Sequence, residues 1–249
     1  MIVEGKTALV TGGSAGIGRE LALQLAAAGA TVIIVARDAD RARTTMAQAS
    51  GRMTLIEADL SLHEEQDRVV SEAARRFPDL AILVNNAGIQ VNLPETGIGD
   101  DGSAAKFREE IAINIAAPVA LSFGLMPVMA RQKEAAIVNI ASGLAIAPKR
   151  TAPVYCATKS AIRTFSRALR YRCEDAAPSI RVIDVVMALV DTEMTRGRGG
   201  GKISAGDAAH AVLKGIEAGK KEVWVGKARL LDLLQRLAPP LAYGRLRNG

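Results

Sequence analysis

TGGSAGIG, residues Thr11 to Gly18, joins an apolar run to a segment with helical periodicity. Gly12 lets the chain turn tightly and approach a phosphate, while Gly16 and Gly18 let a helix pack closely on a strand. The free N–H groups at the start of that helix suit an anion. The stretch therefore predicts the phosphate-binding turn of a dinucleotide site, although an ordinary strand-to-helix turn can carry the same glycines.

Apolar runs alternate with helical stretches along the whole chain. Seven apolar runs are found, and they are TALVTG, TVIIVAR, MTLIEAD, LAILVNNAG, AAIVNIAS, IRVIDVVM and EVWVG. Because the apolar residues are continuous and do not alternate with polar ones, the runs predict strands of a parallel sheet that is covered on both faces. Between most of them lie stretches with apolar residues every three or four positions, over Gly16–Ala28, Glu64–Phe77, Ala105–Arg131 and Val154–Asp175. We therefore expect a single doubly wound α/β domain of Rossmann type, with a seven-stranded parallel sheet, over residues 1–249.

The composition narrows the class of protein. Hydrophobic residues make up 49% of the chain and charged residues 23%, which is ample material for a core. Cys156 and Cys173 are too few for a disulfide framework and lack the companions of a metal site, so we expect no metal and a reducing compartment. No export signal and no uninterrupted apolar run of about eighteen residues is found, which predicts a cytoplasmic protein.

The net charge of +6 is concentrated toward the end of the chain. Residues 196–202 hold three cations, and residues 227–249 hold five cations and one acid, so together they contribute +7 and leave about −1 elsewhere. Without interleaved aromatic residues this charge does not favour nucleic acid. The amphipathic tail, residues 227–249, could pack over the substrate cleft, form a subunit contact or touch a membrane surface; its apolar stripe consists of Leu230, Leu233, Leu234 and Leu237.

Arg37 follows the second predicted strand, at the position that sets the choice of cofactor. An acidic residue there would accept hydrogen bonds from the adenosine ribose, whereas an arginine would pair with a 2′-phosphate. Ala36 stands where the acid is expected, Arg41 lies one helical turn on, and Asp38 is expected to cap that helix. The pattern favours NADP(H) over NAD(H), the alternative being that Arg37 is a solvated loop cation.

Tyr155 and Lys159, in the stretch YCATK, share one helix face because they are four residues apart. A tyrosine hydroxyl has a pKa near ~10, and a positive charge beside it stabilises the phenolate. Tyr155 could then donate a proton to a carbonyl oxygen that receives hydride, or take one from an alcohol. Ser142 ends a predicted strand 13 residues earlier and can hydrogen-bond the same oxygen. Taken alone, such a pair also occurs by chance in many helices.

In this order and at these separations, the motifs resemble those of the short-chain dehydrogenase/reductase family along nearly the whole chain. They are Thr11-Gly12 with Gly16 and Gly18, Asp59, Asn85–Gly88, Asn114, Ser142, and Tyr155 with Lys159. The resemblance implies that Tyr155 is the acid and base, that Lys159 lowers its pKa and holds the nicotinamide ribose, and that Ser142 orients the substrate oxygen. It implies that Asn114 holds a water between Lys159 and solvent, the alternative being a buried amide that ties a helix to a strand.

The resemblance also implies a cofactor-binding set and an assembly. The set consists of Gly12, Ser14, Gly16, Ile17, Gly18, Arg37, Asp59, Leu60, Asn86, Ala87, Gly88, Tyr155, Lys159, Val190 and Thr192. The expected partners are a small carbonyl or alcohol substrate and further copies of the chain, in a homodimer or homotetramer. The sequence departs from the family pattern at Met187 and Ala188, which replace a Pro-Gly pair. Without that pair the turn can follow a different path and change the nicotinamide pocket. This departure motivates a second hypothesis, that the protein is a nucleotide-binding regulator without turnover.

The substrate is expected beyond the carboxyl ends of the strands. Bordering segments are Ile89–Lys106, Leu144–Val154 and a substrate loop over about residues 188–205. Two stretches within this region, Pro94–Ser103 and Arg196–Lys202, are expected to be irregular loops. The apolar residues of these segments suggest an apolar pocket. Four cations lie nearby in the sequence, and they either attract an anionic carbonyl compound or are solvated; the cations are Lys149, Arg150, Arg196 and Arg198.

Overall fold

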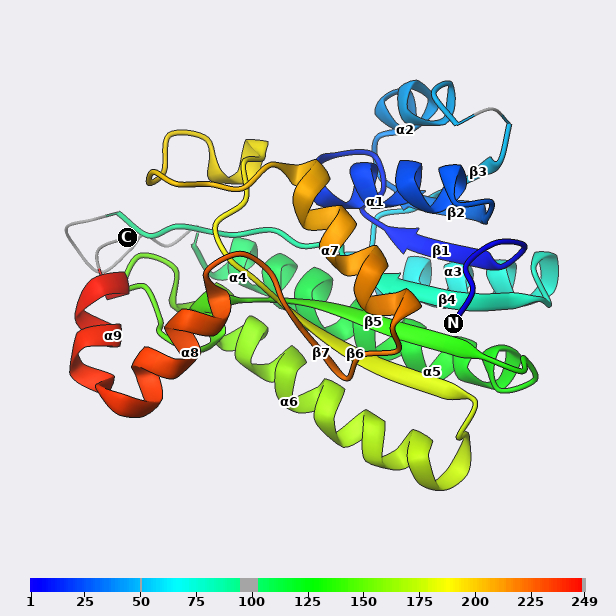
Figure 1. The fold of residues 1–249 in the computed structure, drawn as a ribbon. Helices are drawn as coiled ribbons and strands as arrows, with labels where there is room; N and C mark the ends of the chain where they lie inside the picture. Colours follow the sequence, from blue (N-terminus) through cyan, green and yellow to red (C-terminus); the bar gives the residue numbers. More distant parts are fainter. Residues whose placement is uncertain (50, 95–102, 248–249) are drawn as a thin grey trace.

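The computed structural model describes residues 1–49, 51–94 and 103–247, which surround a parallel sheet of strand order β3-β2-β1-β4-β5-β6-β7 (Figure 1). Each strand lies on one of the predicted apolar runs: β1 (Thr7–Thr11), β2 (Thr31–Ala36), β3 (Met53–Glu57), β4 (Leu80–Asn85), β5 (Ala135–Ser142), β6 (Ile180–Met187) and β7 (Glu222–Trp224). The chain crosses from the edge strand β3 to β4 beside β1, so the strand order reverses there. Ligands of such sheets bind at this switch point. The expected fold class is confirmed.

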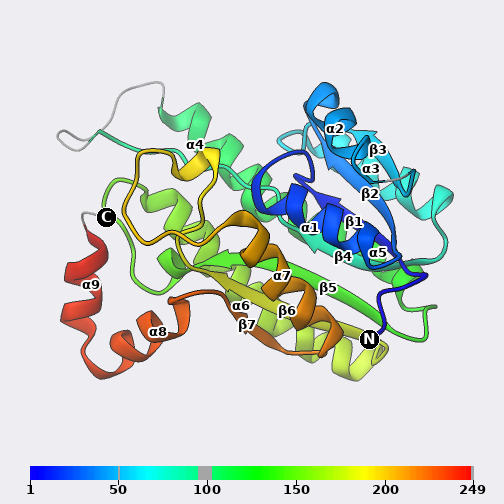
Figure 2. The ribbon, with the colours of Figure 1, turned by 45° about the horizontal axis from the view of Figure 1, so that its top comes forward.

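Helices cover both faces of the sheet (Figures 1 and 2). One face carries α1 (Gly16–Ala27), α2 (Ala39–Met46) and α7 (Ala205–Glu217), and the other carries α3 (His63–Arg76), α5 (Ala117–Met129) and α6 (Pro153–Ala176). Strand residues alternate between the two sides, since Ala8 and Val10 belong to the first buried cluster and Leu9 to the second. Because both sides are buried, the strands read as continuous apolar runs.

The helix expected over Ala105–Arg131 begins earlier and is interrupted. α4 (Ser103–Ile111) leads into a π-helical turn, η1 (Ala112–Ala116), and then into α5. Ser103 therefore lies in a helix and not in the loop expected over Pro94–Ser103; residues 95–102 of that loop lie outside the described residues. Single π-turns within helices are frequent at functional sites, and this one carries Asn114.

Length and composition alone would let the segment Ser103–Met129 cross a membrane, because its most apolar window has a mean hydropathy of 1.9. In this fold the segment packs against α3 and the sheet, and 44% of that window is buried. Its apolar character therefore has an explanation in the core of the domain, since a helix that covers a sheet is apolar on the covering face.

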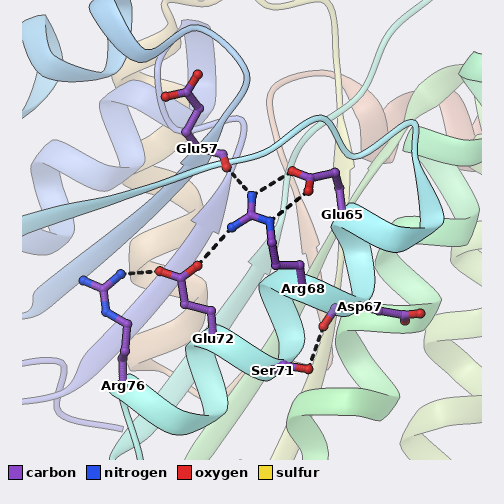
Figure 3. A network of polar contacts seen from close by, with 7 residues as sticks. All are labelled: Glu57, Glu65, Asp67, Arg68, Ser71, Glu72 and Arg76. Atoms are coloured by element: carbon purple, nitrogen blue, oxygen red, sulfur yellow. Dashed lines mark hydrogen bonds and ion pairs between the residues drawn. The ribbon is translucent and has the colours of Figure 1, made fainter.

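Arg68 on α3 holds the carboxyl end of β3 in place (Figure 3). Its guanidinium donates to the carbonyl oxygen of Glu57, the last residue of β3. The same guanidinium forms ion pairs with Glu65 at 2.7 Å and with Glu72 at 3.0 Å, and Glu72 also pairs with Arg76. This network ties the start of α3 to the strand that leads into Asp59.

The tail folds into two helices, α8 (Ala228–Leu237) and α9 (Pro239–Arg247), at the same end of the molecule as the loop after β6 (Figure 1). α8 ends before Pro239 as expected, but Pro239 also begins α9, since a proline fits the first turn of a helix. The expected apolar stripe is largely open. Leu230, Leu233 and Leu237 have exposed fractions of 63%, 51% and 76%.

Candidate active site

A cavity of about 1040 Å³ opens at the carboxyl ends of the strands. The loops after β1 to β6 all contribute to its lining, and α8 and α9 add leucine side chains from the tail. The cavity therefore lies where the reversal of strand order predicts a ligand site. It joins the expected cofactor and substrate regions in one space.

The glycine turn is built by close contact between β1 and β4. Gly12 has φ +66°, and a Cβ atom there would lie 3.0 Å from the Cα atom of Ala87. The hydroxyl of Thr11 accepts the N–H groups of Asn86 and Ala87, each at 3.0 Å. Gly18 packs even more closely, because a Cβ atom there would lie 2.3 Å from the carbonyl oxygen of Gly12. The sequence motif thus sets how the first helix meets the turn.

Most of the predicted cofactor residues line this one cavity: Gly12, Ser14, Gly16, Ile17, Arg37, Asp59, Leu60, Asn86, Ala87, Gly88, Tyr155, Lys159, Val190 and Thr192. Gly18 is outside the lining, since it packs α1 on the turn. At the start of α1, Ala15 provides no side-chain cap and the first turn holds no acidic residue. The first N–H groups of that helix therefore remain suited to an anion.

Two arginines lie at the end of β2. Arg37 is 66% exposed and makes long contacts, at 3.5 Å to Asp59 and 3.4 Å to Glu109. Arg41 pairs with Glu193 at 3.0 Å. Asp38 caps α2 as expected, because its carboxylate accepts the N–H of Arg41 at 3.0 Å. Both arginines line the cavity.

Asp59 is held in its ionised form by its surroundings. Burial raises the pKa of this carboxyl, but hydrogen bonds from Ser61 and the charge of Arg37 together lower the pKa below its ordinary value. The N–H of Ser61 donates to Asp59 at 2.9 Å. Asp59 is therefore a fixed hydrogen-bond acceptor on the β3 side of the cavity.

Ser142, Tyr155 and Lys159 meet on the opposite side of the switch point. Ser142 is the last residue of β5, and its hydroxyl oxygen accepts the N–H of Leu144 at 3.2 Å. Its hydroxyl also acts on the ionisation of Tyr155. The Lys159 ammonium donates to the carbonyl oxygen of Ile140 at 2.9 Å and lies 5.6 Å from the centroid of the Tyr155 ring. All three side chains line the cavity.

The pKa values of this pair differ from the simple expectation that Lys159 lowers the pKa of Tyr155. Burial raises the pKa of Tyr155 to about 12, and the Ser142 side chain acts in the opposite direction. Burial also lowers the pKa of Lys159 to about 8. The reason is desolvation, which favours the neutral form of both groups and is the largest cause of both shifts.

Asn114 lies behind the cavity lining and forms three hydrogen bonds. Its side-chain oxygen accepts the N–H of Ile89 at 2.9 Å, and its amide donates to the carbonyl oxygen of Ile89 at 2.9 Å and to the Thr158 hydroxyl at 3.1 Å. This is the geometry of a buried amide that ties η1 to the end of β4. A Cβ atom on Gly88 would lie 3.2 Å from the Asn114 oxygen and 3.4 Å from the Lys159 nitrogen, so Gly88 keeps the space between them open.

The turn after β6 reaches the cavity without the Pro-Gly pair. Ala188 donates its N–H to the carbonyl oxygen of Val225 at 3.2 Å, and Val190 forms a parallel bridge with Ile203. Val190 and Thr192 line the cavity, and a Cβ atom on Gly16 would lie 3.2 Å from the Thr192 methyl group. The substrate loop therefore lies against the glycine turn.

The substrate side of the cavity mixes residues that the sequence suggested with residues that it did not. Ile89, Leu144, Leu189 and Met194 line the cavity, as do Lys149 and Arg198, whereas Arg150 and Arg196 do not. Gln90, from the expected segment Ile89–Lys106, accepts a hydrogen bond from Arg198 at 2.6 Å. The members not singled out from the sequence are Leu231 and Leu246 of the tail. Leu231 lies off the stripe that the sequence showed, so only the folding back of α8 places it here.

Comparison with known proteins agrees with this geometry. A family model described as short chain dehydrogenase matches residues 6–201. The chain belongs to the short-chain dehydrogenase family. It is 37% identical over 234 residues to the uncharacterized oxidoreductase DltE of Bacillus subtilis (strain 168), an alignment that covers 90% of this chain and 89% of that protein.

Solved structures of short-chain dehydrogenases share the fold. One from Burkholderia cenocepacia J2315, in complex with NADP, has a TM-score of 0.85 and 27% identity over 100% of both chains. A 3-ketoacyl-(acyl-carrier-protein) reductase from Brucella melitensis, complexed with NADH, has a TM-score of 0.80 and 26% identity over 90% of this chain and 97% of that one. These two structures hold different nicotinamide cofactors, so the likeness does not decide between NADP and NAD.

Proposed function

We propose that this short-chain dehydrogenase transfers hydride between NADP(H) and the carbon of a carbonyl or alcohol substrate, with Tyr155 as general acid and base. The observation that carries the proposal is the meeting of Ser142, Tyr155 and Lys159 in the cavity that the glycine turn also lines. A bound nicotinamide would supply or accept the hydride. The protein supplies the proton and the alignment.

The residues present fit a dinucleotide. The uncapped start of α1 offers N–H groups to the pyrophosphate, and Gly12 and Gly88 line the cavity without side chains, so a ligand can approach their backbone. Asp59 and Leu60 would contact the adenine ring, and Lys159 would hold the nicotinamide ribose. Val190 and Thr192 would contact the nicotinamide from the substrate loop.

Each group near the reacting carbon has one task in the reduction. The proton passes from the Tyr155 hydroxyl to the substrate oxygen, which Ser142 orients through a hydrogen bond. The charge of Lys159 stabilises the phenolate that this step leaves behind. The Asn114 oxygen would hold a water through its second lone pair, because among the described residues one N–H, that of Ile89, donates to it.

The preference for NADP(H) rests on Arg37 and Arg41. Neither arginine is buried, and Ala36 places no carboxylate at the end of β2. The acidic partners of Arg37 lie at long distances, 3.4 and 3.5 Å. A 2′-phosphate carries negative charge and three acceptor oxygens, so it would bind the two guanidinium groups better than these carboxylates do.

For the substrate we propose a carbonyl compound with an apolar body. The lining beyond Ser142 and Tyr155 is formed mainly by apolar side chains from the substrate loop and the tail, namely Leu189, Met194, Leu231, Leu234 and Leu246. Arg198 and Lys227 also line the cavity and suit a polar or anionic end of the same molecule.

The test is a fluorescence titration of the purified protein with NADPH and NADH in parallel, followed by a screen of apolar ketones and aldehydes with the tighter cofactor. We expect NADPH to bind more tightly and at least one carbonyl compound to oxidise it. Cofactor binding without turnover across the screen would favour the reading as a nucleotide-binding regulator. Binding of neither cofactor would refute the oxidoreductase proposal and point to the turn at Met187 and Ala188 as the cause.

We further propose a cytoplasmic homo-oligomer, paired through the long helices of one face. Large apolar side chains are exposed on α4, α5 and α6, where Ile111, Phe123 and Tyr171 have exposed fractions of 46%, 46% and 58%. Light scattering after size-exclusion chromatography should give the mass of a dimer or tetramer. Phe123→Asp should lower that mass, and a monomeric wild-type protein would contradict the proposal.

A further inference from the structure

Glu110 is a buried acid that the reaction as described does not use. It lies on α4, four residues before Asn114, and its exposed fraction is 0%. One carboxylate oxygen accepts the N–H of Val91 at 3.2 Å. The other oxygen, Oε2, is buried and has no hydrogen-bond partner among the described residues. A buried carboxyl with one hydrogen bond is costly unless a charge of opposite sign compensates it.

Glu110 and Asn114 hold the same segment after β4. Asn114 binds the backbone of Ile89, and Glu110 binds the N–H of Val91 two residues further along. Alternate residues of an extended segment point their N–H groups to the same side, and helix residues four apart share a face. Glu110 is therefore one helical turn along the face on which Asn114 lies beside Gly88 and Lys159.

The titratable and charged groups around Glu110 come from three other segments. α6 contributes Tyr155, Cys156 and Lys159, whose ionisation the charge of Glu110 affects. Beyond them, the segment before α6 contributes Lys149, which acts on Cys156, and the loop after β6 contributes Arg198, which acts on Tyr155. Among these, Lys159 is the cation whose charge acts on the Glu110 carboxyl. The neighbouring Glu109 faces away, since it contacts Arg37 at 3.4 Å.

Lys159 is a buried cation whose hydrogen-bond partner carries no charge. It is 5% exposed, and the hydrogen bond that its ammonium donates goes to a neutral carbonyl oxygen, that of Ile140. Burial lowers its pKa, and the charge of Glu110 acts in the opposite direction. Burial likewise raises the pKa of Glu110, and the charge of Lys159 opposes that shift.

We propose that Glu110 is a positioning residue for the proposed reaction, and that its ionised carboxylate is the buried counter-charge that keeps Lys159 protonated beside Tyr155. The proposal rests on the proposed function for its kinetic test. A negative charge makes the loss of a proton harder for every group nearby, so Glu110 raises the first apparent pKa of the Tyr155–Lys159 pair.

The kinetic test is the pH profile of kcat/KM for alcohol oxidation with NADP⁺ in Glu110→Gln, which keeps the shape of the side chain and removes its charge. We expect the apparent pKa of the rising limb to fall by about one unit. Glu174→Gln is the matched control, because this acid on α6 is 49% exposed, pairs with Lys221 at 2.8 Å and lies outside the site. An unshifted profile in Glu110→Gln would overturn the proposal.

A second measurement does not need turnover. An NMR titration of the lysine side chains, with Lys159→Met used to assign the signal, reports the protonation of Lys159 directly. We expect Lys159 to lose its proton at lower pH in Glu110→Gln than in the wild type, and equal titration curves would overturn the counter-charge. If the protein shows no turnover but the pKa of Lys159 is lower in Glu110→Gln than in the wild type, the two proposals separate. The NMR result would then support the role of Glu110 as counter-charge, and the missing turnover would refute only the proposed function.

Discussion

The ammonium nitrogen of Lys159 lies 5.6 Å from the centroid of the Tyr155 ring and donates its hydrogen bond to the carbonyl oxygen of Ile140. The lysine is thus held at the ring face by the backbone of β5 and not by the tyrosine oxygen. Because both side chains are buried, their protonation is set first by desolvation and then by their neighbours.

Tyr155→Phe should remove the proton donor and little else. The substitution deletes one hydroxyl while the ring that packs beside Lys159 remains. Since general acid catalysis contributes about 10²–10⁴-fold, kcat should fall by that factor while the Kd of NADPH stays within about twofold. Tyr171→Phe, at a ring that is 58% exposed, is the control. A Tyr155→Phe protein with full activity would exclude the proton-transfer role.

The burial of Lys159 should make stability depend on pH. Its folded pKa, about 8, lies below the ordinary 10.5, so between these values the unfolded chain binds more protons than the folded one. The free energy of unfolding should then rise as pH increases from about 8 to 10, by at most about 3 kcal/mol. Urea unfolding of the wild type and Lys159→Met across this range measures the effect, and the variant should lack the rise. Parallel curves would show that Lys159 titrates normally.

Arg37→Ala should weaken NADPH binding and leave NADH binding nearly unchanged. A charge-assisted hydrogen bond contributes about 1.5–3 kcal/mol, which corresponds to an increase in Kd of roughly ten- to a hundredfold. Arg43→Ala provides the control, because Arg43 pairs with Asp40 at 2.6 Å and does not line the cavity. Equal losses for both cofactors would mean that Arg37 does not contact a 2′-phosphate.

Gly18→Ala should destabilise the fold, since its new Cβ atom would lie 2.3 Å from the carbonyl oxygen of Gly12. The clash is with backbone, so the turn itself must shift, at a cost of about 1–3 kcal/mol. Gly200→Ala is the matched control, because nothing lies within 4 Å of a Cβ atom there. Thermal denaturation of both variants makes the comparison, and a wild-type melting temperature for Gly18→Ala would contradict the close packing.

The sequence predicted what depends on local pattern. β5 and β6 begin and end where their apolar runs do, because both faces of the central strands are buried. It did not predict the π-turn that carries Asn114, since no residue type marks such a turn, nor the burial of Glu110, since a glutamate in a helix is usually solvated. The place of Leu231 depends on a contact between segments far apart in the chain, which no local pattern encodes.

Leu231→Ala should test whether the tail forms part of the substrate site. A Cβ atom on Gly143 would lie 3.2 Å from a Leu231 methyl group, which places this leucine directly beside the turn after Ser142. Removing apolar contact from a pocket costs about 1–3 kcal/mol of discrimination, so kcat/KM for an apolar ketone should fall by roughly five- to 150-fold while NADPH affinity is retained. Leu237→Ala is the control, because Leu237 is 76% exposed and does not line the cavity. Equal effects of the two substitutions would mean that α8 only covers the body of the domain.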